Sequence, residues 1–369
     1  MAAGGGSIGC TGDWLAADSG KHEIGRLGDW EINLSISQSL NLLFDDDTIL
    51  LGIDTGATKS HALLTDGHGR ILGFAEGGPG NWESVGWAGT RAVLDNIISQ
   101  VVGQAGIDRA QIHGAGLGLA GYDWPEDRAP HVQIIEQLLP TVPFALMNDA
   151  FLGLPAGTDA GWGVVVSAGT SCNATGRNQQ GQIGRLAGSS SFGEYAGAGE
   201  LVQFALQAVS RAWSRRGPET ALGDAFCTAV TAADVPDLLA GLMRGRYDIA
   251  ADKAPVVFAT AAEGDAVALE LVRWAGHSLG DLACGIIRQL ELADQPFEVV
   301  LAGSFYKGSP LLQEAMAEII HMLAPRAQLV HLTAPPVVGA VLLGMEQVGV
   351  NTAVVRQPLV ESVISSRSR

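Results

Sequence analysis

Short apolar runs alternate with polar turns in two stretches of the chain, and the two stretches share one plan. In the first, residues 49–54, 60–66 and 70–76 are apolar-rich runs separated by glycine-containing turns, which predicts a three-stranded meander. In the second, residues 163–167, 172–177 and 182–187 repeat the pattern. The first run of each set ends in Asp54 or Ser167, and a glycine follows two positions later. The repetition predicts two related halves, each with a glycine-bearing turn.

Longer segments with apolar residues at helical spacing connect and follow these runs. They predict helices at 84–105, 128–139, 199–214, 267–290, 311–323 and 337–345, and further strands at 112–120, 142–147, 297–302 and 328–332. Gly106, Pro140 and the Pro335-Pro336 pair mark ends or starts of these helices. Strands and helices in this order predict an α/β fold in which helices pack on a mixed sheet.

The domain organisation follows from the length and from the repeated plan. A chain of 369 residues is long enough for about two domains. We expect a first domain at 49–148 and a second at 149–336, with a helix at 337–348 as a candidate addition to the first. Residues 1–48 have no convincing apolar period, so we expect a poorly structured extension there.

Composition and charge exclude several classes of protein. The formal net charge of −17 argues against a nucleic-acid partner, because phosphate backbones need a basic footprint. No apolar stretch approaches the roughly 18 residues of a membrane-spanning helix, so no membrane partner is expected. The cysteines at 10, 172, 227 and 284 are widely spaced, which is typical of reduced thiols in a cytoplasmic protein.

The first glycine-bearing turn, Asp54-Thr55-Gly56-Ala57-Thr58-Lys59, has the residues of a phosphate site at a strand end. Gly56 permits a tight turn, Thr58 offers a hydroxyl and an amide, and Lys59 adds charge. Asp54 lies where it can hold the water shell of Mg²⁺. Unlike a Walker A loop, the turn leads back into a strand. The alternative is an ordinary hairpin with a polar tip.

The second turn, Ser167-Ala168-Gly169-Thr170-Ser171-Cys172-Asn173, has no acidic residue. The amides of Gly169 and Thr170 can hold a β- or γ-phosphate, while Cys172 and Asn173 face an acceptor. A second polar hairpin is again the alternative.

A third signal is Asn148-Asp149-Ala150, which ends a buried strand and begins a helix. Ligands bind at strand ends in α/β sheets, at the crevice where we expect the two halves to meet. A carboxylate fixed there can take the proton of a hydroxyl that attacks phosphorus, which makes Asp149 a candidate general base. The alternative is that Asp149 only caps the helix.

Weaker signals come from three further strand ends and from the histidines. Asn81 beside Trp82 suits a sugar, and Asp123 is a candidate substrate-binding residue that could also lie near the metal. The small residues at Gly303 and Ser304 would let an adenine ring lie on the backbone. The histidines at 61, 113, 277 and 321 have no metal-ligand spacing and are interpreted as structural, in strands or helices.

In order along the chain, these motifs resemble the actin-like sugar kinases that include N-acetylglucosamine kinase and the BadF/BadG/BcrA/BcrD-type ATPases. The resemblance runs from about 49 to 345 and is most specific in GIDTGATKS, NDA, SAGTSCNATGR and LAGS followed by APPVVGAVLLG. It implies two ribonuclease-H-like domains that close over ATP and a sugar in a central cleft.

The resemblance also implies roles for individual residues. It places Thr58 and Thr170 on the ATP phosphates and Gly303 with Ser304 at the adenosine. It places Asn81, Cys172 and Asn173 on the sugar and Asp149 as the catalytic base. Three segments depart from the family pattern. Ser171 replaces a glycine, Gly188-Ser189-Ser190 replaces Gly-Trp-Gly, and Glu194 stands where a substrate-binding Asp is expected.

The expected function is an ATP-dependent sugar kinase that acts on N-acetylglucosamine or a related amino sugar. Its partners would be the sugar, ATP and Mg²⁺, with a second copy of the chain as a candidate partner in a homodimer. One alternative is a sugar or nucleotide sensor of the same fold that has lost catalysis. The other is an ATP-driven activator of a radical dehydratase, although the chain lacks the closely spaced cysteines of such activators.

Overall fold

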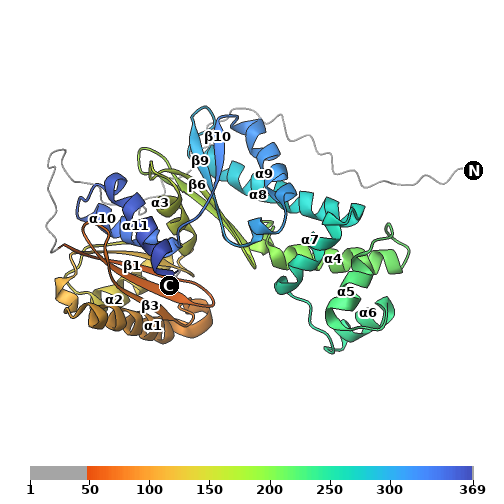
Figure 1. Cartoon of the computed structure of the whole chain (residues 1–369), viewed down its shortest axis with the longest axis horizontal. Coiled ribbons are helices and arrows are strands. Elements are labelled where there is room, and N and C mark those ends of the chain that lie inside the picture. The colour runs from red at the N-terminus through yellow and green to blue at the C-terminus, as the bar shows by residue number, and fades with distance from the viewer. Residues whose placement is uncertain (1–47, 368–369) are drawn as a thin grey trace, which may run out of the picture.

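Two five-stranded sheets with the same strand order organise the chain, one in each of two lobes (Figure 1). The computed structural model describes residues 48–367. Cys10 and nearly all of the expected extension at 1–48 lie outside the described residues.

The sheet of the first lobe has the order β3-β2-β1-β4-β5. The antiparallel meander is confirmed, and β4 and β5 continue the sheet parallel to β1. Its strands are β1 (Ile49–Thr55), β2 (Ser60–Asp66), β3 (Ile71–Gly77), β4 (Gly114–Leu119) and β5 (Phe144–Met147).

The sheet of the second lobe repeats this plan with the order β8-β7-β6-β9-β10. Its first three strands are again antiparallel, and β9 and β10 are again parallel to the first. The strands are β6 (Gly163–Ala168), β7 (Cys172–Arg177), β8 (Ile183–Arg185), β9 (Phe297–Ala302) and β10 (Ala327–His331). The repeated order confirms the two related halves and the α/β fold that the sequence predicts.

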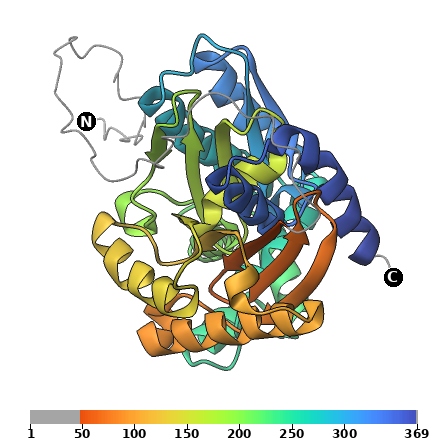
Figure 2. The same cartoon turned by 90° about the vertical axis from the view of Figure 1, so that its left-hand side faces the viewer.

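Helices cover both faces of the first sheet, because its strands are apolar on both sides. Leu51 and Ile53 of β1 lie in one core cluster with residues of α1 (Trp82–Ala105) and α2 (Arg128–Leu138). Leu50 points to the opposite face, where it joins residues of α10 (Pro336–Gln347) and α11 (Thr352–Arg367). Figure 2 shows the red and orange strands between the orange helix α1 and the blue C-terminal helices.

The second sheet is covered by helices inserted between β8 and β10. Leu279, Ala283 and Ile286 of α8 (Ala266–Gln289) are buried in one cluster with Val164 and Val166 of β6. The other helices of this lobe are α4 (Ala198–Trp213), α5 (Leu222–Val230), α6 (Val235–Met243), α7 (Ala254–Ala262) and α9 (Pro310–Leu323). Figure 1 shows α5 and α6 at the end of the lobe farthest from the first sheet.

The helix α10 returns from the second lobe to the first and packs closely on β1 and β4. A Cβ at Gly52 would lie 2.6 Å from the backbone nitrogen of Val341, and one at Gly116 would overlap the Ala340 carbonyl oxygen. Only glycine therefore allows this approach of helix to strand. At its other side, α10 meets the short helix α3 (Gly153–Gly157), which leads into the second sheet.

An ion pair also connects α10 to the second sheet. Arg177 of β7 donates to both carboxylate oxygens of Glu346, at 2.9 and 3.1 Å, and its Nε donates to the Gly161 carbonyl at 2.9 Å. The Arg177 side chain is largely buried, and bidentate pairing offsets the cost of removing its charge from water.

The expected elements agree with the observed ones to within about two residues. One difference is His113, which was expected in a strand and lies in the loop before β4. Its Nδ1 accepts a hydrogen bond from the backbone N–H of Ile49 at 3.1 Å, so its interpretation as structural stands.

Within residues 48–367, no single helix has the length and apolar composition to cross a membrane. The helices α5 and α6 together reach that length and composition, but the pair is bent by 61°.

The close packing of α10 generates a stability prediction. Replacing Gly116 by Ala places a Cβ against the Ala340 carbonyl, so the helix must move away from the sheet. We expect a loss of about 2 kcal/mol or more in the free energy of unfolding, because overpacking a buried contact costs about 1–3 kcal/mol. Thermal unfolding followed by circular dichroism measures the change.

Gly103→Ala is the matched control. Gly103 lies on the exposed face of α1, and a Cβ there meets nothing within 4 Å. This substitution is expected to leave the midpoint unchanged or to raise it, because Ala is a better helix former by up to about 1 kcal/mol. Equal effects of the two substitutions would contradict the packing argument.

Candidate active site

The first glycine-bearing turn lies at the carboxyl end of β1. The Gly56 N–H donates to the Lys59 carbonyl at 2.9 Å and closes the turn, while Thr58 and Lys59 are exposed at its tip. The Gly56 carbonyl accepts from the Gly80 N–H at 3.1 Å, which ties the turn to the loop before α1. The side chains of Thr58 and Lys59 thus remain available to a ligand.

Asp54, at the end of β1, is held in place by a neighbouring histidine. His61 of β2 lies between two carboxylates, with its Nδ1 3.6 Å from Asp54 and its Nε2 3.3 Å from Glu76. The His61 side chain is 8% exposed, so this contact fixes one side of Asp54 from within the sheet. His61 therefore has a structural role, as the sequence predicts, and it also supports the candidate site residue Asp54.

The second glycine-bearing turn rests on the start of α4. The Gly169 carbonyl accepts from the Ala198 N–H, and the Thr170 carbonyl accepts from the Gly199 N–H, both at 2.9 Å. Gly303 follows β9 with φ of 108° and lies directly against the Ala168 carbonyl, where a side chain would not fit. Two chain segments predicted to share a ligand, 167–173 and 303–304, therefore lie side by side.

A pocket of about 730 Å³ opens beside these two segments. It brings together Gly169, Thr170 and Ser304, and its lining does not include Gly303. The remaining wall is mostly small and apolar, with polar groups from two side chains; it consists of Ala198, Ala251, Asp252, Ala254, Pro255, Phe258, Ala259, Ala262, Phe305, Lys307 and Gly308. Its volume falls in the range of small-molecule and cofactor sites, about 300–1,000 Å³.

Asp149 begins a single 3-10 turn, Asp149–Leu152, at the end of β5. The cap of this turn is Asn148, whose side-chain oxygen accepts from the Ala150 N–H at 2.9 Å. Burial raises the pKa of Asp149 to about 7, and the negative charges of Asp54 and Asp123 contribute. Asn148 thus caps the turn in place of Asp149. The Asp149 carboxyl has a pKa suited to proton transfer near neutral pH.

Asp123 follows β4 and is linked to the same Asn148. The Asn148 Nδ2 donates to Asp123 Oδ1 at 2.8 Å. The pKa of Asp123 is raised to about 6, mainly by burial and also by the charges of Glu83 and Asp127, while the charge of Arg185 lowers it. Asp54, Asp123 and Asp149 therefore form a group of interacting carboxylates at the strand ends of the first sheet.

Such a group can accept a proton and can attract a cation, because like charges close together favour protonation or a counterion. Within residues 48–367, no cluster of three or more His, Cys, Asp or Glu side chains is arranged to bind a metal directly. Mg²⁺ usually keeps several waters and takes one or two carboxylates together with substrate phosphates, so Asp54 and its neighbours fit this ion.

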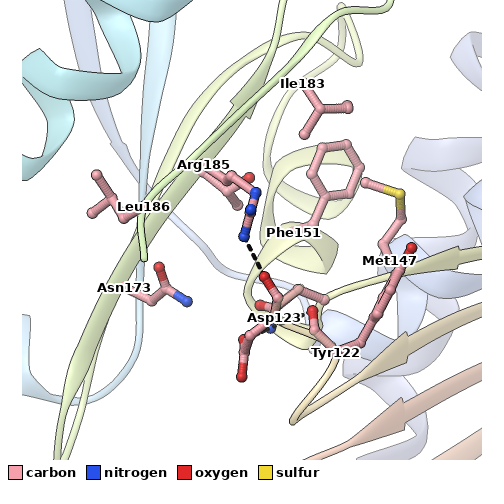
Figure 3. A pocket seen from close by; sticks show the side chains of 10 residues that line it. Tyr122, Asp123, Met147, Phe151, Asn173, Ile183, Arg185 and Leu186 are labelled. Carbon is pink, nitrogen blue, oxygen red and sulfur yellow. Dashed lines mark hydrogen bonds between the residues drawn. The ribbon is translucent and has the colours of Figure 1, made fainter. Parts of the chain in front are cut away.

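A small cavity of about 30 Å³ is lined by residues of both lobes (Figure 3). Asp123 and Asn173, both predicted site residues, face it from opposite lobes. The rest of its lining is Tyr122, Met147, Asn148, Phe151, Thr175, Ile183, Arg185 and Leu186. The structure thus brings together one residue expected near the metal and one expected on the sugar.

The Glu194 carboxylate binds backbone amides. It accepts from the N–H groups of Ala187 (2.9 Å), Gly188 (2.5 Å) and Ser189 (3.1 Å). Gly188 has φ of 79°, and a Cβ there would lie 3.8 Å from Asp123 and 3.9 Å from Asn173. In this structure Glu194 therefore shapes the loop that borders Asp123 and Asn173.

Two predicted sugar contacts already have partners within the protein. Cys172 lies 3.9 Å from the Glu194 carbonyl, and burial raises the pKa of its thiol to about 11. Asn81 caps α1, where its Oδ1 accepts from the Glu83 N–H at 2.9 Å. The Trp82 ring stacks on Trp87, with centroids 4.5 Å apart. The tryptophan face expected beside a sugar is thus covered on one side.

Sequence reasoning missed three residues of the site. Asn148 was noted only as part of a motif, although it contacts Asp123 and caps the turn that carries Asp149. Phe258 lines the large pocket, and Arg185 lies at the small cavity. The signal for Asn148 was present in the sequence, because Asn is among the preferred helix caps.

Comparisons with known proteins give matches over most of the chain. The BadF/BadG/BcrA/BcrD ATPase family matches residues 51–344. N-acetyl-D-glucosamine kinase of Dictyostelium discoideum is 25% identical over 311 residues, which are 80% of this chain and 98% of that protein. N-acetylmuramic acid/N-acetylglucosamine kinase of Clostridium acetobutylicum is 22% identical over 302 residues, 81% and 98% of the two chains.

Solved structures show the same fold. A protein assigned as an N-acetylglucosamine kinase from Chromobacterium violaceum has a TM-score of 0.57 at 25% identity, over 80% of this chain and 98% of its own. The ROK hexokinase of Thermus thermophilus has a TM-score of 0.52 at 19% identity, over 82% and 99%. The predicted actin-like kinase fold is confirmed. Since the family match spans most of the sequence, this chain belongs to the BadF/BadG/BcrA/BcrD ATPase family.

Proposed function

We propose that this chain transfers the γ-phosphoryl group of ATP to a hydroxyl of N-acetylglucosamine or a related amino sugar, with Asp149 as the general base. The enzyme class, an ATP-dependent carbohydrate kinase, follows from the family and from the two kinases that it resembles in sequence. The free thiols of Cys172, Cys227 and Cys284 suit a cytoplasmic location for the enzyme.

The observation that carries the proposal is the position and pKa of Asp149. Its carboxyl stands at a strand end between the lobes, with a pKa of about 7 and two other carboxylates nearby. A base with this pKa is half ionised near neutral pH, and it regains the proton-accepting form readily. The sugar hydroxyl would lose its proton to Asp149 as its oxygen attacks the γ-phosphorus.

The large pocket suits ATP. Its apolar wall of alanines with Phe258 offers a slot for a purine, and the backbone at Gly169 and Thr170 lies at one side of it. Amides of a glycine-bearing turn can bind phosphate oxygens, so the triphosphate would run from this turn toward Thr58 and Lys59 of the first lobe.

Mg²⁺ fits beside Asp54. When bound, the ion would neutralise negative charge on the phosphates, and Asp54 would hold it through its water shell. His61 keeps the Asp54 carboxylate at the strand end.

The sugar would lie where Asp123 and Asn173 face one another across the cleft. Gly188 borders both side chains. Glu194 fixes the Gly188 loop by accepting three hydrogen bonds from backbone N–H groups. A direct sugar contact of Glu194 would require some of these bonds to be exchanged for bonds to hydroxyls. Closing the lobes over this region would exclude water and limit hydrolysis of ATP.

Replacing Asp149 by Asn tests the assignment of the base. The amide keeps the shape of the side chain but cannot accept the hydroxyl proton, so we expect kcat for sugar phosphorylation to fall by about 10²- to 10⁴-fold. The dissociation constant of Mg·ATP, measured by calorimetry, should change by less than about threefold.

Asp123→Asn is the comparison variant, because Asp123 is the other carboxyl with a raised pKa. We expect it to raise the sugar KM more than it lowers kcat. Near-normal turnover by Asp149→Asn, together with a collapse of kcat in Asp123→Asn, would transfer the base role to Asp123 and overturn the assignment.

The pKa of Asp149 predicts the pH dependence. The base works when ionised, so kcat/KM for the sugar should fall tenfold per pH unit below an apparent pKa near 7 and should level off above it. Asp54 raises this pKa, so the acidic limb of Asp54→Asn should lie at lower pH. A wild-type profile that is flat between about pH 5 and pH 8 would contradict the assignment.

A panel of acceptors tests the choice of sugar. ADP release in a coupled assay should be strongest with N-acetylglucosamine or a related amino sugar, and weaker with glucose. The remaining panel members are glucosamine, N-acetylmannosamine and muramic-type sugars. ATP turnover with no response to any sugar would favour the alternative, a sensor of the same fold.

A further inference from the structure

Arg185 is the last residue of β8 and is fixed to the second lobe on both sides of its backbone. Its N–H donates to Gln289 Oε1 at 3.0 Å, and its carbonyl accepts from Gln289 Nε2 at 3.0 Å. Gln289 is the last residue of α8, so the start of the Arg185 side chain is anchored to a strand and a helix at once.

The Arg185 side chain crosses to the first lobe. Its guanidinium donates to the backbone carbonyl of Asp123 (Figure 3). The same group lies over the Trp124 ring, 4.6 Å from the ring centroid. An arginine suits this position because its planar group can stack on an aromatic ring and donate in its own plane at the same time.

The loop that Arg185 contacts is internally rigid. Asp127 Oδ2 accepts from the N–H groups of Asp123 and Trp124, at 3.1 and 2.8 Å. The Trp82 indole N–H donates to the Gly121 carbonyl at 2.6 Å. These hydrogen bonds hold the loop together as one unit. The hydrogen bond from Arg185 to the Asp123 carbonyl therefore also positions the Asp123 carboxylate.

Charge gives Arg185 a second effect on Asp123. The Asp123 carboxyl is buried and faces Glu83 from α1 and Asp127 from its own loop, both of which raise its pKa. Arg185, from β8, is the cation that acts in the opposite direction. Arg185, the smallest of these contributions, therefore lowers the pKa of Asp123 from the other lobe.

We propose that Arg185 is a positioning residue that joins the two lobes beside the small cavity and holds Asp123 oriented toward the acceptor sugar. The inference rests on the proposed sugar-kinase function. Arg185 lines the small cavity with Asn173 and Asp123, whereas the lining of the large pocket does not include it. Its effect is therefore confined to the acceptor side of the reaction.

The experiment compares Arg185→Met, which removes the cation, with Arg185→Lys, which keeps the charge but loses the planar group. In Arg185→Met we expect the sugar KM to rise about tenfold or more and the pKa of Asp123 to rise by about one unit, with Mg·ATP affinity unchanged. In Arg185→Lys we expect a smaller rise in KM and a pKa of Asp123 close to that of the native protein.

The pKa of Asp123 is read by ¹³C NMR of labelled aspartate carboxyls, with the Asp123 signal assigned by its loss in Asp123→Asn. Arg91→Met is the control, because Arg91 is an exposed cation on α1 and is expected to change neither quantity. Trp124→Leu removes the ring contact on an exposed side chain, so it should raise the sugar KM without moving the pKa of Asp123.

Unchanged KM and unchanged pKa of Asp123 in Arg185→Met would overturn the inference. If Arg185→Met does not fold, Arg185→Lys and Trp124→Leu decide it, because a native sugar KM in both is incompatible with the proposed contact. The NMR titration needs no turnover. A shifted pKa of Asp123 in a protein without sugar-kinase activity would therefore refute the proposed function and leave the effect of Arg185 on Asp123 standing.

Discussion

The close approach of α10 to β1 and β4 is the contact on which the rest of the architecture depends. Glycines on the strands let the helix backbone lie against the sheet, and α10 in turn contacts the short helix that leads into the second lobe. Residues of β5, β6, β9 and α10 share one buried cluster between the two sheets. The lobes therefore meet through packed backbone and apolar side chains, and their strand ends face a common cleft.

That geometry explains the electrostatics of the site. Bringing the strand ends of the first sheet together at the cleft puts Asp54, Asp123 and Asp149 within reach of one another's charge. The folded protein keeps the carboxyls of Asp123 and Asp149 partly desolvated, which costs stability, and it thereby retains two groups whose pKa lies near neutral pH. A site of this kind does not need a strongly basic surface to bind phosphates, because a bound cation can neutralise their charge. The acidic character of the whole chain is consistent with a cation entering together with its phosphate ligand.

The sequence predicts the fold well because its signals are local. Runs of apolar residues separated by glycine turns define β1 to β3 and β6 to β8, and helical periods define α1, α8 and α10. The carboxylates at strand ends were also predictable, because Asp54, Asp123 and Asp149 each directly follow or end an apolar run. Asp149 was distinguished from a helix cap only by the structure, in which Asn148 supplies the cap.

Residues whose role depends on distant partners were not predictable. Arg185 contacts Trp124 and Gln289, each separated from it by a long stretch of sequence, and nothing in the local pattern indicates either contact. Glu194 looked like a ligand of the substrate, and the three amides that it accepts from became visible only in the folded loop. The helix that follows Asn81 identifies this residue as a candidate cap. The sequence therefore allows two roles for its side chain, as a helix cap and as a sugar contact.

The position of α10 in the sequence has a consequence for biosynthesis. The face of the first sheet that carries Leu50 and Leu63 is covered by residues 337–345, which leave the ribosome long after the strands themselves. During synthesis this apolar face stays uncovered while the whole second lobe is made. The first lobe to be synthesised is thus the last to be completed, and a nascent chain that stops before Pro336 presents an open sheet face to chaperones or to other chains.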